Sequence, residues 1–241
     1  MNNLKGKTAY ITGGTKGIGL GIAEAMMAEG MNVLITGRTK ATITNTVKSL
    51  NTKGLKGKAI GVEADVRNLE EQEKAVAQLT KNFGQLDVVI ANAGVGHFAA
   101  IEDMTSEQWQ ETMDVNLTGV FNSIKAGLDD LKTSKGYFIS IASLAGTNFF
   151  AKGAAYNASK FGLVGFTQAV MLDLRKYGIK CTTIMPGSVA TYFNNHTPTS
   201  DDDWKIQPED LGQMVIDLLR MNERTLPSKI EVRPTIPGGK K

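Results

Sequence analysis

Short apolar runs alternate with longer amphipathic stretches along most of the chain. Several of the short runs are apolar almost throughout, which is typical of strands whose two faces are both covered by helices. We expect strands at residues 8–12, 32–36, 58–64, 86–92, 136–143, 181–187 and 228–234. The amphipathic stretches include residues 19–30, 70–84 and 106–133. This alternation predicts an α/β fold in which a seven-stranded parallel sheet is doubly wound, with helices on both faces.

The length and composition fit one ordinary globular domain. The chain has 241 residues without an internal repeat or a low-complexity linker, so we expect a single domain over residues 1–241. The formal net charge of +3 comes from 27 basic and 24 acidic residues, an excess too small to predict binding to nucleic acid or to a membrane surface. The single cysteine, Cys181, excludes an internal disulfide, and its apolar neighbours favour an inert buried thiol.

The sequence carries no pattern typical of export or membrane insertion. The opening stretch MNNLKGKTAYIT lacks the apolar core of a signal peptide, and no apolar run approaches the ~18 residues of a membrane span. A single cysteine also indicates a reducing compartment. Together these observations predict a cytoplasmic protein.

A glycine-rich bend follows the first predicted strand and precedes the first predicted helix. In the stretch TGGTKGIGLGIAEA the glycines are Gly13, Gly14, Gly17 and Gly19, followed by Gly21 within the helix. Without side chains the backbone can turn sharply and approach a pyrophosphate, while the helix N-terminus offers free N–H groups. The spacing Gly-x-x-x-Gly-x-Gly is neither the G-x-G-x-x-G fingerprint nor a P-loop. Its place between a strand and a helix is what predicts a nucleotide site.

The end of the second predicted strand indicates which dinucleotide binds. An NAD site usually carries an acidic residue there, which holds the ribose hydroxyls. Here Gly37 takes that position and Arg38 follows it, while Lys16 places a second cation inside the glycine turn. No carboxylate is expected there to repel a 2′-phosphate, and the planar guanidinium of Arg38 can bind one. Simple solvation of both cations is the alternative, but the combination favours NADP(H) as the cofactor.

The stretch AAYNASKFGL places Tyr156 and Lys160 four positions apart. On a helix this spacing puts both side chains on one face, about one turn apart. The spacing alone leaves two interpretations open: an anchoring tyrosine beside an unrelated surface lysine, or a pair that moves a proton. The motifs in the rest of the chain decide between them.

Further motifs follow the glycine turn in order. They read EADV, NAG, DVNLTGVF, SIASLAG, YNASK and PGSVAT, and with the glycine turn they extend from about residue 7 to residue 191. This ordered set resembles the short-chain dehydrogenase/reductase family, and the whole set is far more specific than any one motif. The resemblance implies a Rossmann-type doubly wound fold and an oxidoreductase that uses a dinucleotide.

The resemblance also implies a role for each matched residue. Asn116 would hold a water in a proton relay, although an asparagine taken alone is better explained by a bond to the helix backbone. The implied catalytic residues are Asn116, Ser143, Tyr156 and Lys160. The implied cofactor-binding residues are Gly13, Thr15, Lys16, Gly17, Ile18, Gly19, Arg38, Asp65, Val66, Asn92, Ala93, Gly94, Tyr156, Lys160, Pro186, Gly187, Val189 and Thr191.

These residue types suit the reduction of a carbonyl group. When a hydride reaches the carbonyl carbon, the oxygen gains charge and needs a proton, but a phenol is a weak acid with a pKa of about 10. The ammonium of Lys160, together with an oxidised nicotinamide, is expected to lower the pKa of Tyr156. Ser143 can donate a hydrogen bond to the same substrate oxygen. Ser143 occupies the family's position thirteen residues before Tyr156, whereas Ser140 should point to the other side of its strand.

The sequence outside these motifs is less informative. The two histidines, His97 and His196, are far apart and form no recognisable metal site with the single cysteine. His97 could line the pocket or lie on an exposed loop, and the run SDDDW at residues 200–204 is most simply a solvated loop. We expect a substrate loop at residues 192–210 and a fraying tail at residues 236–241.

Aromatic residues near the motifs are expected to give the substrate pocket an apolar wall. They are Phe98, Phe149, Phe150, Tyr192 and Phe193. We therefore expect an NADPH-dependent reductase of ketones or aldehydes, with 3-oxoacyl thioesters as the leading substrates. Bacterial 3-oxoacyl-(acyl-carrier-protein) reductases are similar in size and motifs, but the tail of this chain lacks their glycine-rich ending.

Two other classes of protein are open. A regulator that senses NADP(H) without catalysis would need the glycine turn but no proton donor, so the set of Ser143, Tyr156 and Lys160 argues against it. A purely structural interaction protein fits poorly with so many cofactor motifs. By analogy with the family we expect a homodimer or homotetramer that associates through the helices after residues 103 and 156.

Overall fold

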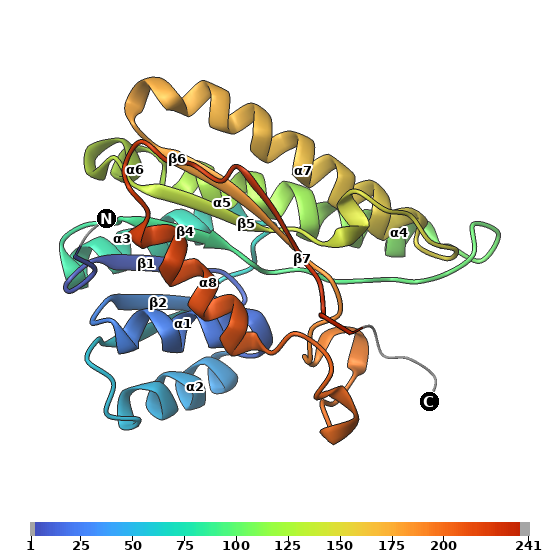
Figure 1. The fold of residues 1–241 in the computed structure, drawn as a ribbon, viewed down its shortest axis with the longest axis horizontal. Coiled ribbons are helices and arrows are strands. Elements are labelled where there is room, and N and C mark those ends of the chain that lie inside the picture. Colours follow the sequence, from blue (N-terminus) through green and yellow to red (C-terminus); the bar gives the residue numbers. More distant parts are fainter. Residues whose placement is uncertain (1–2, 237–241) are drawn as a thin grey trace.

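The computed structural model describes residues 3–236, and these form a parallel sheet with helices on both faces (Figure 1). Within that range the sheet has seven strands in the order β3-β2-β1-β4-β5-β6-β7. The strands are β1 (Thr8–Ile11), β2 (Asn32–Gly37), β3 (Ala59–Glu63), β4 (Val88–Ala91), β5 (Tyr137–Ile141), β6 (Lys180–Pro186) and β7 (Lys229–Val232). The predicted fold class and all seven predicted strands are confirmed.

The strand order places a reversal point at the centre of the sheet. β1 pairs with β2 on one side and with β4 on the other, so that Ile11 is opposite both Ile35 and Ile90. The crossovers therefore run outward in opposite directions from β1, and a crevice opens beyond the carboxyl ends of β1 and β4. This crevice is where a ligand is expected to bind.

Eight α-helices within the described range connect or flank these strands. They are α1 (Gly17–Ala28), α2 (Lys40–Thr52), α3 (Leu69–Phe83), α4 (Ser106–Met113), α5 (Gly119–Ala126), α6 (Leu128–Ser134), α7 (Ala154–Leu174) and α8 (Pro208–Arg220). The helices predicted around residues 19–30 and 70–84 are confirmed by α1 and α3.

The amphipathic stretch 106–133 is not one continuous helix. A π-helical turn, Asp114–Thr118, separates α4 from α5, and the backbone leaves helical geometry at Gly127 before α6. Gly127 packs so closely on the sheet layer that a methyl group there would lie 2.7 Å from Leu86 Cδ2. The apolar periodicity is that of helices, but it does not reveal these two interruptions.

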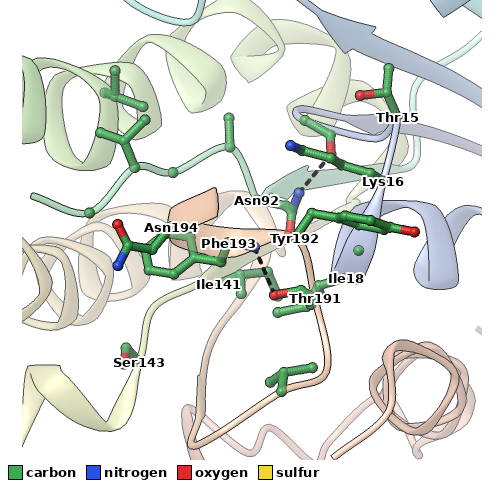
Figure 2. Close-up of a pocket in the computed structure, with 18 of the residues that line it drawn as sticks. Thr15, Lys16, Ile18, Asn92, Ile141, Ser143, Thr191, Tyr192, Phe193 and Asn194 are labelled. Atoms are coloured by element: carbon green, nitrogen blue, oxygen red, sulfur yellow. Dashed lines mark hydrogen bonds between the residues drawn. The ribbon is translucent and has the colours of Figure 1, made fainter. Parts of the chain in front are cut away.

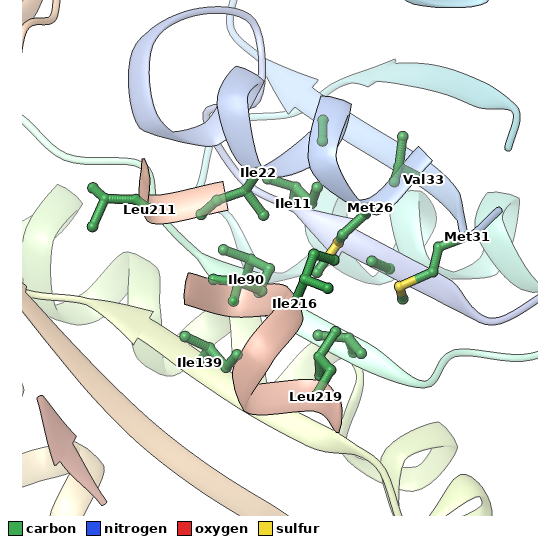
Figure 3. Packing of buried hydrophobic residues seen from close by; sticks show 14 of the residues in the cluster. Ile11, Ile22, Met26, Met31, Val33, Ile90, Ile139, Leu211, Ile216 and Leu219 are labelled. Atoms are coloured by element: carbon green, nitrogen blue, oxygen red, sulfur yellow. The ribbon is translucent and has the colours of Figure 1, made fainter. Parts of the chain in front are cut away.

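Adjacent residues along each strand pack into two different cores, one on each face of the sheet. On one face, Ile11 and Ile90 pack with Ile22 of α1 and Ile216 of α8 (Figure 3). On the other face, Tyr10 and its neighbours pack with the apolar sides of α3, α5 and α7. Burial of apolar surface on both faces explains why the strands are apolar almost throughout.

Cys181 belongs to the second of these cores, as the sequence predicts. Its thiol is fully buried, and burial raises the thiol pKa to about 12. A thiol in such surroundings is inert as a nucleophile at neutral pH.

The predicted substrate loop at 192–210 is mostly irregular but ordered around short turns. It contains two 3-10 turns, Phe193–Asn195 and Ser200–Asp202, and α8 already begins at Pro208. The last three residues of the predicted loop are therefore helical. A bridge between Val189 and Ile206 closes the base of the segment 192–207.

Ile236 is exposed, and the rest of the predicted tail, residues 237–241, lies outside the described residues. Within residues 3–236, none of the helices combines the length and apolar character that crossing a bilayer requires.

Candidate active site

A cleft of about 900 Å³ follows the carboxyl edge of the sheet. Its walls come from the glycine turn, from the ends of five strands and from the segment after β6 (Figure 2). The structure brings every implied site residue to this cleft except Asn116 and Gly19. Residues that are far apart in the sequence therefore meet in one place, as the family resemblance implies.

The glycine turn has the shape of a cradle that side chains would fill. Gly13 and Gly17 adopt left-handed backbone conformations, with φ of 64° and 55°. A methyl group on Gly13 would lie 3.0 Å from Ala93 Cα, and one on Gly19 would lie 2.6 Å from Asn92 Nδ2. α1 begins without a side-chain cap, so the amides of its first turn are left for a ligand. These observations fit the pyrophosphate of a dinucleotide.

The NAG turn after β4 holds the glycine turn in place. The Asn92 side chain donates to the carbonyl oxygens of Thr12 and Gly13, at 2.9 and 3.1 Å. The Thr12 hydroxyl in turn accepts from the backbone amides of Asn92 and Ala93, at 3.0 and 3.1 Å. Gly19 contributes by letting α1 approach this network, which explains why it does not line the cleft itself.

Arg38 lies at the end of β2, as predicted, but a carboxylate is close to it. Glu111 of α4 places Oε1 3.8 Å from Arg38 Nη1 and Oε2 2.8 Å from His97 Nε2. The expectation that no carboxylate lies near the end of β2 is therefore wrong. The sequence near β2 does not show it, because the acidic residue arrives from a helix more than seventy positions later.

Asp65 lies at the floor of the same end of the cleft. Its carboxylate pairs with the Arg67 guanidinium at 2.5 to 3.0 Å, and this hydrogen bonding lowers the pKa of Asp65. Val66 lines the cleft beside it. Both residues therefore lie in the same cleft as the other implied cofactor-binding residues.

Tyr156 and Lys160 share one face of α7, and their side chains meet at the other end of the cleft. Lys160 Nζ lies 5.7 Å from the centre of the Tyr156 ring and donates to the Ile141 carbonyl oxygen at 3.1 Å. The Lys160 side chain is buried, and burial lowers its pKa to about 8. An exposed surface lysine is excluded by this arrangement.

The groups of the protein alone raise the pKa of Tyr156, whereas the predicted lowering depends on an oxidised nicotinamide as well as on Lys160. Burial raises the pKa of its phenol, and the Ser143 hydroxyl beside it only partly opposes the rise. The reason is that burial penalises the phenolate more than the neighbouring groups of the protein stabilise it. The chain by itself therefore keeps Tyr156 protonated, which is the state that a proton donor requires.

The two serines of SIASLAG separate as the alternation along β5 predicts. Ser140 bonds to the Thr167 hydroxyl at 2.9 Å inside the core, whereas Ser143 lines the cleft. Ser143 also accepts from the Ala145 amide at 3.1 Å, which fixes its side chain.

Asn116 lies behind the cleft rather than on its wall. It sits in the π-helical turn, where its side chain accepts from the Val95 amide at 2.8 Å and donates to the Val95 carbonyl oxygen at 2.9 Å. It also donates to the Ser159 hydroxyl at 3.0 Å. These bonds hold the loop after the NAG turn against α7, so Asn116 binds backbone, but that of a loop and not that of a helix as the alternative interpretation had it.

An aromatic wall surrounds Tyr156. The Phe98 ring lies 5.4 Å from the Tyr156 ring, and the Phe193 ring lies 5.7 Å from Tyr156 and 6.3 Å from Phe98, so the three rings contact one another. Phe150 extends the wall outward, 5.8 Å from Phe98. Phe149 points into solvent with 86% of its surface exposed, so it takes no part in the wall.

The beginning of the segment 192–207 makes one local hydrogen bond and one contact with the glycine turn. The Phe193 amide donates to the Thr191 hydroxyl at 3.3 Å (Figure 2). Lys16 Nζ lies 5.9 Å from the centre of the Tyr192 ring, so the glycine turn and the segment touch across the cleft.

A carboxylate organises the far part of this segment. Asp202 binds Lys205 Nζ at 2.5 Å and His196 Nε2 at 2.6 Å, and these two bonds lower its pKa. Because the Asp202 side chain is buried, the interpretation of SDDDW as a solvated loop is wrong for this residue. We call Asp202, His196 and Lys205 the carboxylate clasp.

Sequence reasoning missed Glu111 and Lys205 as cleft residues and left His97 undecided. All three line the cleft. Each reaches it through the packing of a segment whose position no local motif fixes. Among residues 3–236, no group of three or more histidine, cysteine or acidic side chains is arranged to hold a metal ion.

Comparison with known proteins agrees with this geometry. The model of the short chain dehydrogenase family matches residues 7–202. A D-beta-hydroxybutyrate dehydrogenase from Cupriavidus necator is 37% identical, over 78% of this chain and 72% of its own. A putative ketoacyl reductase from Streptomyces coelicolor is 32% identical, over 93% of this chain and 87% of its own.

Solved structures share the whole fold. An alcohol dehydrogenase from the archaeon Thermococcus sibiricus, complexed with 5-hydroxy-NADP, superposes with a TM-score of 0.87 and 26% identity, covering 95% of this chain and 97% of its own. A metagenomic short-chain oxidoreductase in complex with NADP gives a TM-score of 0.84 and 28% identity, covering 98% of this chain and all of its own. The chain belongs to the short-chain dehydrogenase/reductase family of oxidoreductases.

Proposed function

We propose that the protein is an NADPH-dependent reductase that converts a ketone or aldehyde to an alcohol, with Tyr156 as the proton donor. The observation that carries the proposal is the meeting of Tyr156, Lys160 and Ser143 in the cleft that also holds the glycine turn. Arg38 lies at the end of β2, three strands away from β5, a distance of about 14 Å across the sheet. One extended ligand can therefore contact both groups.

The residues of the chain supply each part of the reaction except the hydride. NADPH, when bound, provides the hydride. Tyr156 donates its phenolic proton to the carbonyl oxygen as negative charge develops there. Lys160, fixed by Ile141 beneath the tyrosine, stabilises the phenolate that remains. Ser143 donates a hydrogen bond to the same oxygen and so stabilises the developing charge.

The choice of NADPH over NADH is supported by two cations and by the relatives. Arg38 can bind a 2′-phosphate through its planar guanidinium, and Lys16 lies in the glycine turn. Both structural relatives described above were solved with NADP or a derivative of it. The carboxylate of Glu111, 3.8 Å from Arg38, opposes this preference.

The aromatic wall supports a substrate with an apolar arm. Phe193 lines the cleft at Tyr156, and Phe98 and Phe150 continue the apolar surface outward. A 3-oxoacyl thioester carries a ketone next to such an arm, and the Streptomyces coelicolor relative is named as a putative ketoacyl reductase. We propose 3-oxoacyl thioesters as the first substrates to test.

The test is NADPH oxidation with a panel of carbonyl compounds that includes a 3-oxoacyl thioester, with NADH in parallel. Turnover of a carbonyl compound with a clear NADPH preference is the expected result. A clear NADH preference would refute the proposed cofactor. Tight NADPH binding without turnover of any compound would favour a non-catalytic sensor of NADP(H).

We further propose that the chain is a single-domain cytoplasmic protein that forms a homodimer or homotetramer. The exposed rings of Phe121 on α5 and Phe161 on α7, each 44% exposed, support association through these helices. Sedimentation velocity at two protein concentrations tests the oligomeric state, and a monomer at both would refute this part of the proposal.

A further inference from the structure

Glu111 holds two partners on its two carboxylate oxygens. Oε2 is bound by His97 Nε2 at 2.8 Å, while Oε1 lies 3.8 Å from Arg38 Nη1. The Glu111 side chain is 35% exposed and the Arg38 side chain is 61% exposed. His97 therefore holds one oxygen of the Glu111 carboxylate, while the other oxygen pairs with Arg38, which is the more exposed side chain of that pair.

The other carboxylate close enough to act on Arg38 has its hydrogen bonds elsewhere, although its charge is also felt by Arg38. Asp65 is the second carboxylate of this end of the cleft, and it binds Arg67 through both oxygens. Arg67 also experiences the charges of Glu111 and Asp114. Within residues 3–236, Glu111 is therefore the one carboxylate at ion-pair distance from Arg38.

We propose that Glu111 competes with the cofactor 2′-phosphate for Arg38 and thereby sets how strongly the cleft discriminates NADPH from NADH. This inference rests on the proposed function, because it assumes that Arg38 binds the phosphate. Arg38 can make its best bond to a phosphate as a planar fork, and to do so it must leave the Glu111 carboxylate. NADH carries no 2′-phosphate, so its binding does not require this exchange.

The bond to His97 indicates that Arg38, rather than Glu111, is the side chain that moves. His97 keeps its own oxygen of Glu111, so the carboxylate stays in place when Arg38 turns away. After the exchange, Glu111 remains beside the phosphate as a negative charge that has lost its arginine partner. Both the lost ion pair and this repulsion weaken NADPH binding and leave NADH binding unaffected. Glu111 thus acts as a specificity-determining residue through Arg38.

The expected effect is moderate, because the pair is partly exposed. Exposed ion pairs change an equilibrium by about 0.2 to 1 kcal/mol, and 1.36 kcal/mol corresponds to a factor of ten, so removal of the Glu111 charge should tighten NADPH binding by about 1.4-fold to fivefold. The same change should leave the dissociation constant of NADH within about 1.5-fold of that of the unmodified protein, which is close to the precision of such a measurement.

The experiment measures the dissociation constants of NADPH and NADH by titration calorimetry on the whole protein, for Glu111→Gln and for Glu107→Gln. The glutamine at 111 keeps an oxygen for His97 but loses the charge. Glu107 stands one turn earlier on α4 and does not line the cleft, so Glu107→Gln controls for a general change in charge. A selective gain in NADPH affinity for Glu111→Gln alone supports the proposal.

A double variant separates competition for Arg38 from simple repulsion. Glu111→Gln should increase the NADPH affinity of an Arg38→Ala variant by less than half as much as it increases that of the unmodified protein. The reason is that no guanidinium is then held by Glu111. A gain of full size in that background overturns the proposal, as does an unchanged NADPH affinity in Glu111→Gln. If the unmodified protein prefers NADH, the proposed cofactor fails instead, and the two failures are told apart by the first titration.

Discussion

The side chain of Lys160 crosses from α7 to the end of β5, where its ammonium donates to the carbonyl oxygen of Ile141 at 3.1 Å. Ile141 is the last residue of β5, and Ser143 follows it two positions later. This one bond therefore fixes the ammonium relative to the strand that carries Ser143 and to the helix that carries Tyr156. The relative positions of the three proposed catalytic residues follow from the packing of α7 on β5.

Burial of Lys160 has a consequence for stability at high pH. The pKa of Lys160 is about 8 in the folded protein, below the ~10.4 of an unfolded chain, so the unfolded state binds more protons between these values. The penalty for the buried charge is complete below pH 8 and is relieved as the pH rises toward 10.5. Stability should therefore increase over this window through this group.

The measurement for this prediction is urea unfolding at pH 7 and pH 9.5, for the unmodified protein and for Lys160→Met. Between these pH values the unmodified protein should gain on the order of 2 kcal/mol relative to the variant. Lys48→Met, which removes an exposed lysine, should change in stability between the two pH values by the same amount as the unmodified protein. Parallel pH profiles for all three proteins would contradict the prediction.

Loss of the Tyr156 hydroxyl should stop the reaction without disturbing the fold. In Tyr156→Phe the ring contacts with Phe98 and Phe193 remain, while the proton is lost. We expect kcat for carbonyl reduction to fall by about 10² to 10⁴, and the NADPH affinity to change far less. Tyr177→Phe removes a hydroxyl from an exposed tyrosine outside the cleft and serves as the matched control. Near-normal turnover by Tyr156→Phe would refute the proton-donor role.

Two glycines of the cleft should respond differently to the same added methyl group. Gly13 has a left-handed backbone, and its methyl would meet the Ala93 backbone at 3.0 Å. Gly13→Ala should therefore lose about 1 to 3 kcal/mol of unfolding free energy and at least tenfold in NADPH affinity.

At Gly96 the methyl would meet the ring of Phe193 at 2.6 Å, which can turn away. Gly96→Ala should cost less than ~1 kcal/mol and change the KM of the carbonyl substrate severalfold, because the wall beside Tyr156 is displaced. Thermal unfolding, calorimetry and steady-state kinetics compare the two variants. Equal losses of stability and NADPH affinity would show that the two positions are not distinguished in this way.

The carboxylate clasp should protect the segment 192–207 from proteases. The bonds from Lys205 and His196 lower the pKa of Asp202, so their contribution is present above the ~3.9 of an unfolded aspartate and is lost as the pH falls through the lower folded value. At pH 7, Asp202→Asn should therefore be cleaved within this segment several times faster than the unmodified protein.

Limited proteolysis followed by mass spectrometry locates the cleavage. Asp203→Asn changes an exposed neighbour of the same type and should be cleaved at the original rate. Equal rates for the two variants would mean that the clasp does not hold the segment.

The features that could be predicted from the sequence are those that follow a regular apolar pattern or belong to a motif. The strands were predictable because their apolar residues must fill a core on each face of the sheet. The glycine turn was predictable because a side chain at position 13 would collide with the backbone of Ala93. Ser143, Tyr156 and Lys160 were predictable through the spacing of a known family. Their positions in the cleft agree with that resemblance.

The remaining features depend on contacts between segments that carry no motif. Glu111 reaches Arg38 only through the packing of α4, and Asp202 is buried only because a short turn brings Lys205 and His196 to it. The direction of the Tyr156 pKa depends on its burial, which spacing does not reveal. Such features require the three-dimensional arrangement.

The π-helical turn at Asp114–Thr118 determines how α5 is rotated about the helix axis relative to α4. Its wider turn, closed by the Gly119 amide on the Asp114 carbonyl oxygen, accommodates one residue more than an α-helical turn, and each residue rotates the helix by about 100°. Val115 in this turn lines the cleft, while Val120 just after it packs in the core on the other face. A deletion of one residue here would straighten the helix and turn one of these two faces away from its partner, so the length of this turn constrains the chain as firmly as any side chain in it.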